Sequence, residues 1–312
     1  MDVPAPREPA APSRPSVLAE VNARTGRQHR WQRRLAGGEQ DGAHLVLDDG
    51  RPVVLKWQPP GWRADRLLQA FPAVVHATDG GWPAARWLRA GRLADGGAFL
   101  LQEHVRGRPL RRLDGRGVRA VLAANAVQSG LGFRDAVDDS HQLEAVLSGD
   151  CAWKARVAAF TPSGAALVQH GDAVAAWAAP AVIPDSDVVH GDYSSTNILL
   201  DADGTTATLV DCETVGRGSR VRDLADLYRQ SFVYPEDADT GSPLLRAAAT
   251  AVEGPQVFAR CAVAVTYNNL AWWVEHRTPA AFDQACDRLH RLFDDLRPRG
   301  GQRATSAPDS TT

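Results

Sequence analysis

The residues best suited to chemistry in this chain of 312 residues lie close together in the sequence. His190-Gly191-Asp192 is followed by Asn197, and Asp211 lies fourteen residues beyond Asn197. Carboxylate and amide oxygens are the ligands that Mg²⁺ takes, usually one or two from the protein together with water and phosphate oxygens. If Asn197 and Asp211 meet, they can hold such an ion, and Asp192 lies near enough to accept the proton of a substrate hydroxyl. The alternative is a surface turn capped by an Asp side chain.

Short strands must position these groups. Three short strands are expected at 188–190, 197–200 and 206–210, separated by polar loops, and Asp203-Gly204 is typical of the turn of a β-hairpin. In such a hairpin the start of one strand meets the end of the other. The pattern therefore predicts that Asn197 lies beside Asp211.

The loop resembles the H-G-D-x-x-x-x-N motif and the following Asp of the aminoglycoside phosphotransferase and choline kinase family. Members of this family are kinases of small molecules and are related to the protein kinases. The resemblance implies that Asp192 is the catalytic residue, that Asn197 and Asp211 are metal ligands, and that His190 supports the loop. It implies ATP and Mg²⁺ as cofactors and transfer of the γ-phosphoryl group to a hydroxyl.

The resemblance extends to the nucleotide site. Lys56 ends the segment VVLK and looks like the family's phosphate-binding lysine. Only two of the 35 basic residues are lysines, so a solvated charge at a strand end is the weaker interpretation. Gly37 and Gly38 stand where the family has a phosphate-covering loop. By the same resemblance, the carbonyl of Glu103 and the amide of Val105 would contact adenine.

Two acidic residues are candidates for support. Asp223 matches the family element G-x-x-x-x-D-L-A, in which the Asp braces the catalytic loop near His190. An acidic helix residue should also pair with Lys56. Asp65 is the candidate, because no Glu occurs between Lys56 and Asp95. The alternative for Asp65 is an exposed residue that stabilises the first turn of a helix.

The surrounding sequence predicts an α+β protein with a two-lobed, protein-kinase-like fold. Three antiparallel strands are expected over residues 31–58, a helix from about residue 64, and a further strand over 98–105. Helical periodicity dominates beyond residue 107. The predicted organisation is a disordered tail at 1–16, a nucleotide-binding lobe at 17–106, a catalytic and acceptor-binding lobe at 107–296, and a second disordered tail at 297–312.

Composition excludes several classes of protein. The net charge of -2 provides no field that would attract nucleic acid or an anionic membrane. No apolar run reaches the roughly 20 residues that span a bilayer, and the N-terminus lacks a signal peptide, so a cytoplasmic location is expected. Four widely spaced cysteines without a CxxC pair argue against a zinc site or a disulfide framework.

The acceptor is less defined than the reaction. Residues 1–107 carry 15 basic and 11 acidic side chains (+4), whereas 108–312 carry 20 and 26 (-6), which suits ATP and a cationic acceptor such as an aminoglycoside. Surface solubility explains the imbalance nearly as well. Choline, homoserine and macrolide kinases remain alternatives, as does a non-catalytic nucleotide-binding regulator. The helix around Tyr267 either lines the acceptor pocket or packs in the core.

The His-Gly-Asp triplet occurs a second time, at residues 170–172. Trp177 occupies the position where a metal-binding Asn would be required, and the Ala-rich surroundings predict a continuous helix. We therefore expect Asp172 to be a solvent-facing helix residue without a catalytic role.

Overall fold

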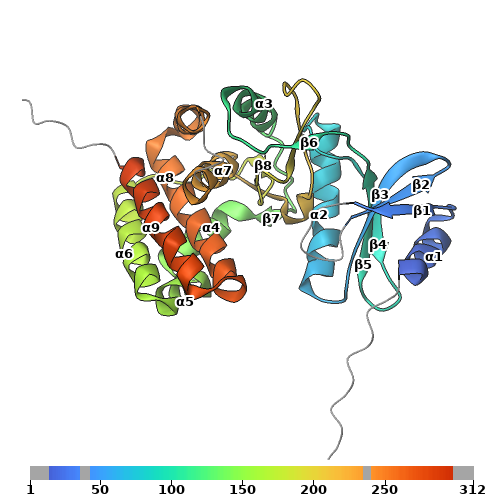
Figure 1. The fold of residues 1–312 in the computed structure, drawn as a ribbon, viewed down its shortest axis with the longest axis horizontal. Coiled ribbons are helices and arrows are strands. Elements are labelled where there is room, and N and C mark those ends of the chain that lie inside the picture. Colours follow the sequence, from blue (N-terminus) through green and yellow to red (C-terminus); the bar gives the residue numbers. More distant parts are fainter. Residues whose placement is uncertain (1–13, 36–42, 235–239, 298–312) are drawn as a thin grey trace, which may run out of the picture.

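The structure is a computed structural model, which describes residues 14–35, 43–234 and 240–297. It confirms the predicted α+β class, with a β-rich N-terminal region and a helical C-terminal region. Figure 1 shows the main sheet at one end of the molecule, helices α4, α5, α6, α8 and α9 at the other end, and several short strands between them. Among the described residues, no helix combines the length and apolar composition needed to cross a membrane.

The elements follow one another in an order that separates the two regions. The strands in the described residues are β1 (Arg30–Arg34), β2 (His44–Asp48), β3 (Arg51–Gln58), β4 (Trp87–Arg92), β5 (Ala98–Glu103), β6 (Arg108–Pro109), β7 (Val137–Asp138), β8 (Asp187–Val189), β9 (Ile198–Leu200), β10 (Ala207–Leu209) and β11 (Gly216–Gly218). The helices are α1 (Arg14–Thr25), α2 (Trp62–Asp79), α3 (Gly115–Ala126), α4 (Asp139–Ser148), α5 (Ala152–Phe160), α6 (Pro162–Ala178), the 3₁₀ helix η1 (Cys212–Thr214), α7 (Val221–Val233), α8 (Ser242–His276) and α9 (Pro279–Leu296).

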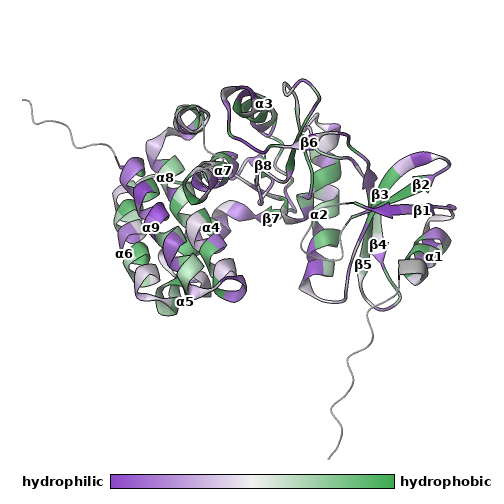
Figure 2. Cartoon of the chain, in the orientation of Figure 1, coloured by the Kyte–Doolittle hydropathy of each residue, from purple (hydrophilic) through white to green (hydrophobic). Residues whose placement is uncertain are grey.

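The N-terminal sheet has the antiparallel order β1-β2-β3-β5-β4, which confirms the predicted three-stranded meander. Strand β4 was not predicted, because it is an edge strand with a bulge and mostly exposed residues. Helix α2 packs against one face of the sheet, where Leu67 and Leu100 belong to the same buried cluster. Strand β1 is mostly hydrophilic and exposed (Figure 2).

Helix α1 corrects the predicted N-terminal tail. The tail was expected to extend to residue 16, but the helix begins at Arg14. Val17 and Val21 are fully buried against Leu55 and Leu101 on the sheet face opposite α2. These contacts stabilise the helix, because burying one such side chain contributes roughly 1.5–3 kcal/mol.

Two small sheets form the centre of the molecule. Strands β9 and β10 make the predicted hairpin, with Leu200 opposite Ala207 and Ile198 opposite Leu209. Strand β8 belongs to the other sheet, in the order β7-β11-β8. The loop from β8 to β9 therefore crosses between two sheets. The predicted lobe boundary at residues 106–107 lies between β5 and β6, which belong to different sheets, and it stays a prediction.

Apolar helix faces form the core of the C-terminal region. Figure 2 shows both hydrophobic and hydrophilic residues on α9, and its buried side carries Phe282, Leu289 and Phe293. Tyr267 on α8 is fully buried, and its hydroxyl donates to the carbonyl oxygen of Val168 at 2.9 Å. Tyr267 therefore packs in the core, which was one of the two alternatives for this helix, and a role of the helix in an acceptor pocket stays a prediction.

Candidate active site

The loop between β8 and β9 is shaped by His190 and Gly191. His190 is fully buried, and its Nε2 lies 2.9 Å from the carbonyl oxygen of Val210. The backbone amide of Asp192 donates to the other ring nitrogen, Nδ1, at 3.3 Å. Gly191 has a φ of +83°, and a Cβ there would lie 2.4 Å from the carbonyl oxygen of Thr214. Only glycine fits this turn without strain.

Asp192 and Asn197 are in direct contact. The amide nitrogen of Asn197 donates to Oδ2 of Asp192 at 2.9 Å and to its carbonyl oxygen at 3.1 Å. Asp192 is exposed to solvent, whereas Asn197 is buried. The backbone amide of Val210 donates to the carbonyl oxygen of Asn197 at 2.9 Å, which brings Asp211 next to Asn197 as the hairpin predicts.

Asp211 and Lys56 form an ion pair between the two regions. Nζ of Lys56 lies 2.7 Å from Oδ1 of Asp211 and 3.4 Å from Oε1 of Glu213. Burial by itself would lower the pKa of Lys56, but the two carboxylates more than offset this and raise it above its ordinary value. The same ammonium group lowers the pKa of Asp211. Lys56 is thus a fixed positive charge beside an ionised carboxylate.

Glu213 is a site residue that the sequence reasoning missed. Its Oε2 accepts a hydrogen bond from Nε2 of Gln58 at 3.0 Å, in addition to its contact with Lys56. The sequence feature that could have revealed Glu213 is its position, two residues after the predicted metal ligand Asp211. Cys212 between them is buried, and burial raises the pKa of its thiol, so it acts as a small apolar residue.

Asp65 is not the partner of Lys56 in this structure. Its carboxylate forms an ion pair with Arg92, and 64% of its side chain is exposed. Asp65 lies in the first turn of α2, where a carboxylate is also favourable to the helix dipole. The prediction failed because it relied on closeness in sequence, whereas the carboxylates that reach Lys56 come from residues 211 and 213.

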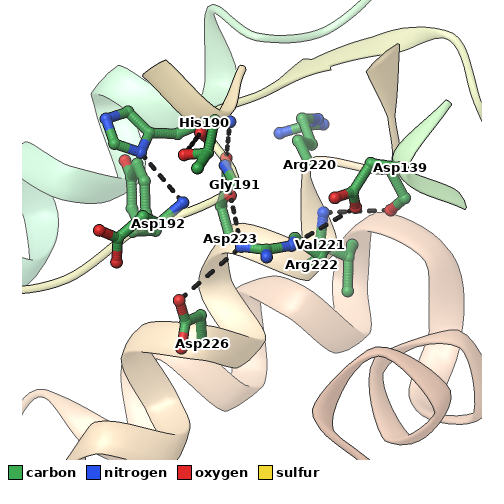
Figure 3. A network of polar contacts seen from close by, with 12 residues as sticks. Asp139, His190, Gly191, Asp192, Arg220, Val221, Arg222, Asp223 and Asp226 are labelled. Carbon is green, nitrogen blue, oxygen red and sulfur yellow. Dashed lines mark hydrogen bonds and ion pairs between the residues drawn. The ribbon is translucent and has the colours of Figure 1, made fainter. Parts of the chain in front are cut away.

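Asp223 connects helix α7 to the start of the loop. Its Oδ2 accepts the backbone amide of His190 at 2.8 Å, and its Oδ1 accepts that of Gly191 at 3.2 Å (Figure 3). Nε2 of the buried Gln128 donates to Oδ2 at 2.6 Å. Nη1 of Arg222 lies 3.5 Å from Oδ1 of Asp223, which partly neutralises this buried carboxylate.

Arg222 stands at the centre of a buried ionic network below the loop (Figure 3). Its Nε lies 3.4 Å from Asp139, and its Nη1 lies 3.7 Å from Asp226. Asp226 also receives hydrogen bonds from Arg229 at 2.8 and 3.2 Å. Burial raises the pKa of Asp139, whereas nearby Arg222 opposes that shift. A buried network of this kind fixes geometry, since removal of one member leaves an unpaired charge.

The pKa of Asp192 is raised above its ordinary value. Its recessed position between the two regions is the main cause, and the carboxylates of Asp226 and Asp211 add to it, while His190 opposes the shift. The side chain is nevertheless accessible to solvent. An accessible carboxylate with a raised pKa can accept a proton from a bound hydroxyl.

The predicted adenine contacts lie at the end of β5. Glu103 is the last residue of that strand, its side chain is exposed, and its backbone amide donates to the carbonyl oxygen of Arg86 at 2.8 Å. Val105 is half-buried two residues later. Gly37 and Gly38 lie outside the described residues.

The donor set suits a hard divalent cation. Among the described residues, no cluster of three or more His, Cys, Asp and Glu side chains is arranged to hold a metal. Mg²⁺ does not need one, because one or two protein oxygens together with substrate phosphates suffice. The amide nitrogen of Asn197 is committed to Asp192, so its amide oxygen is the atom that can bind a cation beside Asp211.

A sequence profile described as the phosphotransferase enzyme family matches residues 31–262. This match covers most of the chain, so the chain belongs to that family. The membership confirms the resemblance carried by the His190-Gly191-Asp192 loop. A search of curated protein sequences finds no significant match.

Solved structures share the fold at low identity. A thermostable mutant of aminoglycoside phosphotransferase APH(4)-Ia, in a ternary complex with ADP and hygromycin B, is 14% identical with a TM-score of 0.66, over 90% of this chain and 97% of that chain. An aminoglycoside phosphotransferase from Alicyclobacillus acidocaldarius is 16% identical with a TM-score of 0.59, over 92% and 94%. Choline kinase LicA from Streptococcus pneumoniae is 11% identical with a TM-score of 0.61, over 91% and 99%. These similarities confirm the predicted two-lobed, protein-kinase-like fold.

Proposed function

We propose that this protein is an ATP-dependent kinase that transfers the γ-phosphoryl group to a hydroxyl of a small molecule. Residues 17–106 bind the nucleotide, and residues 107–296 supply the catalytic loop and the acceptor site. The carbonyl of Glu103 and the amide of Val105 contact adenine, and the loop containing Gly37 and Gly38 covers the phosphates. Membership of the phosphotransferase enzyme family supports this assignment.

The observation that carries the proposal is the arrangement of Lys56, Asp211, Asn197 and Asp192. Lys56 binds Asp211 at 2.7 Å, and Asn197 holds the accessible carboxylate of Asp192 at 2.9 Å. Phosphoryl transfer requires three components, which are a bound cation, a phosphate-binding ammonium group and a proton acceptor. A binding module without catalysis has no use for the proton acceptor.

In this mechanism the protein mainly provides position and charge. Phosphoryl transfer passes through a loose transition state, so alignment of the reactants and neutralisation of charge account for most of the catalysis. Asp192 orients the acceptor hydroxyl and takes its proton, while Lys56 holds phosphate oxygens. Asn197 and Asp211 would hold Mg²⁺, which neutralises phosphate charge when bound.

An aminoglycoside is the acceptor to test first. The acidic balance of residues 108–312, with 20 basic and 26 acidic side chains, favours a cationic acceptor. The fold is shared with an aminoglycoside phosphotransferase that was solved with hygromycin B. It is also shared with a choline kinase, so amino alcohols form the second group.

The test is incubation of the purified protein with ATP, Mg²⁺ and a panel of aminoglycosides, macrolides, choline and homoserine. Mass spectrometry should show one acceptor class gaining a single phosphoryl group, with one ADP formed for each product molecule. Asp192→Asn serves as the matched inactive control. Tight Mg-ATP binding without phosphorylation of any acceptor would instead support a nucleotide-binding regulator.

A further inference from the structure

Helix α7 contacts the catalytic loop at a second point. Gln230 lies seven residues after Asp223, about two helical turns further along, and therefore on the same face of α7. Its Oε1 accepts the backbone amide of Ser195 at 3.1 Å, and its Nε2 donates to the carbonyl oxygen of Tyr193 at 3.4 Å. Gln230 is buried, with 8% of its surface exposed.

The two contacts of α7 divide the loop between them. Asp223 accepts the amides of residues 190 and 191, whereas Gln230 binds residues 193 and 195. The residue left between the two contacts is Asp192. Inside the loop, the amide of Ser194 donates to the carbonyl oxygen of Asp192 at 2.9 Å, and the amide of Asn197 donates to that of Ser194 at 3.0 Å. Any displacement of residues 193–195 is thus transmitted to both functional side chains.

We propose that Gln230 is a positioning residue for phosphoryl transfer, which rests on the function proposed above. Its carboxamide fixes the second half of the loop so that Asp192 and Asn197 keep their relative positions. A displacement of about 1 Å at a reacting group can reduce a rate by about a hundredfold. The side chain does not need to touch ATP, the metal or the acceptor.

A direct contact with the acceptor is the competing role. Gln230 and Ser195 line a small pocket together with Leu110, Leu113 and Tyr234. An acceptor bound there would use the carboxamide for recognition. That role predicts a raised KM for the acceptor, whereas positioning predicts a lowered kcat with KM little changed.

The experiment compares Gln230→Met and Gln230→Glu with the wild-type protein, and uses Ser231→Ala as the matched control. Ser231 lies on the same helix, is similarly buried, and donates only to the carbonyl oxygen of Tyr228, at 2.6 Å. Methionine preserves size and removes both contacts with the loop. We expect kcat to fall by about ten- to a hundredfold in Gln230→Met, with the Kd for Mg-ATP and the acceptor KM within threefold. Ser231→Ala should keep its kcat.

Gln230→Glu adds a second measurement, the pH–rate profile, which would not change if Gln230 only stabilised the fold. Glutamate still accepts the amide of Ser195, so turnover should fall less than in Gln230→Met. It also adds a negative charge beside the loop, so the acidic limb of the pH–rate profile should move to higher pH. Hydrogen exchange of residues 190–200 should accelerate in Gln230→Met and accelerate less in Gln230→Glu, which keeps the bond from Ser195 but cannot donate to Tyr193.

The outcomes separate this inference from the proposed function. A wild-type protein that phosphorylates no acceptor would refute the proposed function. An active wild-type protein together with an equally active Gln230→Met variant would overturn only the positioning role. A raised acceptor KM with unchanged kcat and unchanged loop exchange would overturn it in favour of acceptor contact.

Discussion

The triplet His-Gly-Asp occurs twice in this chain, within helix α6 at residues 170–172 and after strand β8 at residues 190–192. In α6 the three residues have helical backbone, so their amides and carbonyls belong to the helix. After β8 the amides of the first two residues donate to Asp223, and the glycine has a φ of +83°. The same three residue types therefore form regular helix at one position and an irregular loop held by Asp223 at the other.

The two aspartates also differ in what their carboxylates contact. Asp172 forms an ion pair with Lys154 at 2.8 Å and accepts a hydrogen bond from the hydroxyl of Tyr267 at 3.2 Å. Asp172 was predicted to face solvent. This is only partly right, because 41% of its side chain is exposed and the rest is covered. Asp192 contacts Asn197 and stays accessible. One carboxylate is used in packing and the other is available to a ligand.

The largest expected difference lies between Asp192→Asn and Asp172→Asn. Loss of the proton acceptor should reduce kcat by about a thousandfold, because general-base catalysis commonly contributes 10² to 10⁴. Mg-ATP binding should persist in Asp192→Asn, since Asn197 can donate to the new amide oxygen. Asp172→Asn should retain full kcat. Steady-state kinetics and calorimetric titration of Mg-ATP check both, and loss of turnover in Asp172→Asn alone would reverse the assignment of the two triplets.

The two lysines extend the comparison, because each pairs with an aspartate. Lys56→Arg keeps the charge but replaces a compact ammonium with a planar group in a buried space, so kcat should fall by about a hundredfold. Lys154→Arg should retain wild-type kcat, since Lys154 lies on α5 and pairs with Asp172 of α6, outside the candidate active site. Parallel kinetics of the two variants test this expectation, and equal effects would contradict it.

The two glycines should separate activity from stability. A Cβ at Gly191 would lie 2.4 Å from the carbonyl oxygen of Thr214, and one at Gly171 would lie 2.3 Å from the hydroxyl of Tyr267. Both alanine variants should lose about 1–3 kcal/mol in the free energy of unfolding. Only Gly191→Ala should also lose activity, by at least about tenfold. Urea unfolding and kinetics on the same samples would show this.

A second substitution sharpens the glycine test. Tyr267→Phe removes the atom that a Cβ at position 171 would meet first, so it should partly restore the stability of Gly171→Ala. Position 191 faces backbone instead, and it offers no such rescue. Failure of Tyr267→Phe to restore any stability would show that the contact with the hydroxyl is not what restricts position 171.

The pH dependence distinguishes Asp192 by the direction of its pKa shift. Because the folded protein raises this pKa, the ionised base is present only above the raised value, and kcat/KM should fall as the pH drops through it. The acidic limb should therefore lie above the ordinary Asp value of about 4. Asp226→Asn removes a neighbouring carboxylate and should move the limb to lower pH. A limb that does not move would exclude this electrostatic coupling.

Local patterns predicted the elements near the candidate active site, but not the contacts between elements that are distant in sequence. Asp203-Gly204 indicated the β9–β10 hairpin, and the H-G-D-x-x-x-x-N motif indicated that Asp192 and Asn197 belong to one site. Contacts such as that of Gln230 with the loop join residues whose spacing carries no signal. The predicted pairing of Asp65 with Lys56 failed for the same reason, because the actual partner of Asp65 depends on how α2 lies against β4.

Helix α1 and strand β4 were missed for a different reason. Pro and Ala near the N-terminus suggested a tail, yet Val17 and Val21 pack on the sheet. Tertiary burial thus outweighs local composition at this end of the chain. Edge strands such as β4 have little apolar alternation, so a pattern of period two does not reveal them.

The smallest expected effects concern the ion pair between Lys154 and Asp172. Partly exposed ion pairs contribute about 0–1 kcal/mol, so Lys154→Arg should leave the free energy of unfolding within about 0.5 kcal/mol of wild type. Asp172→Asn loses the charge but still accepts from Tyr267, and should cost about 0.5 kcal/mol. Asp172→Ala also loses that acceptor, yet the hydroxyl keeps its bond to Val168, so the loss should stay near 1 kcal/mol. Urea unfolding should give this order with unchanged kcat throughout, and a loss above about 3 kcal/mol in Asp172→Ala would mean that this triplet supports the fold far more than its exposure indicates.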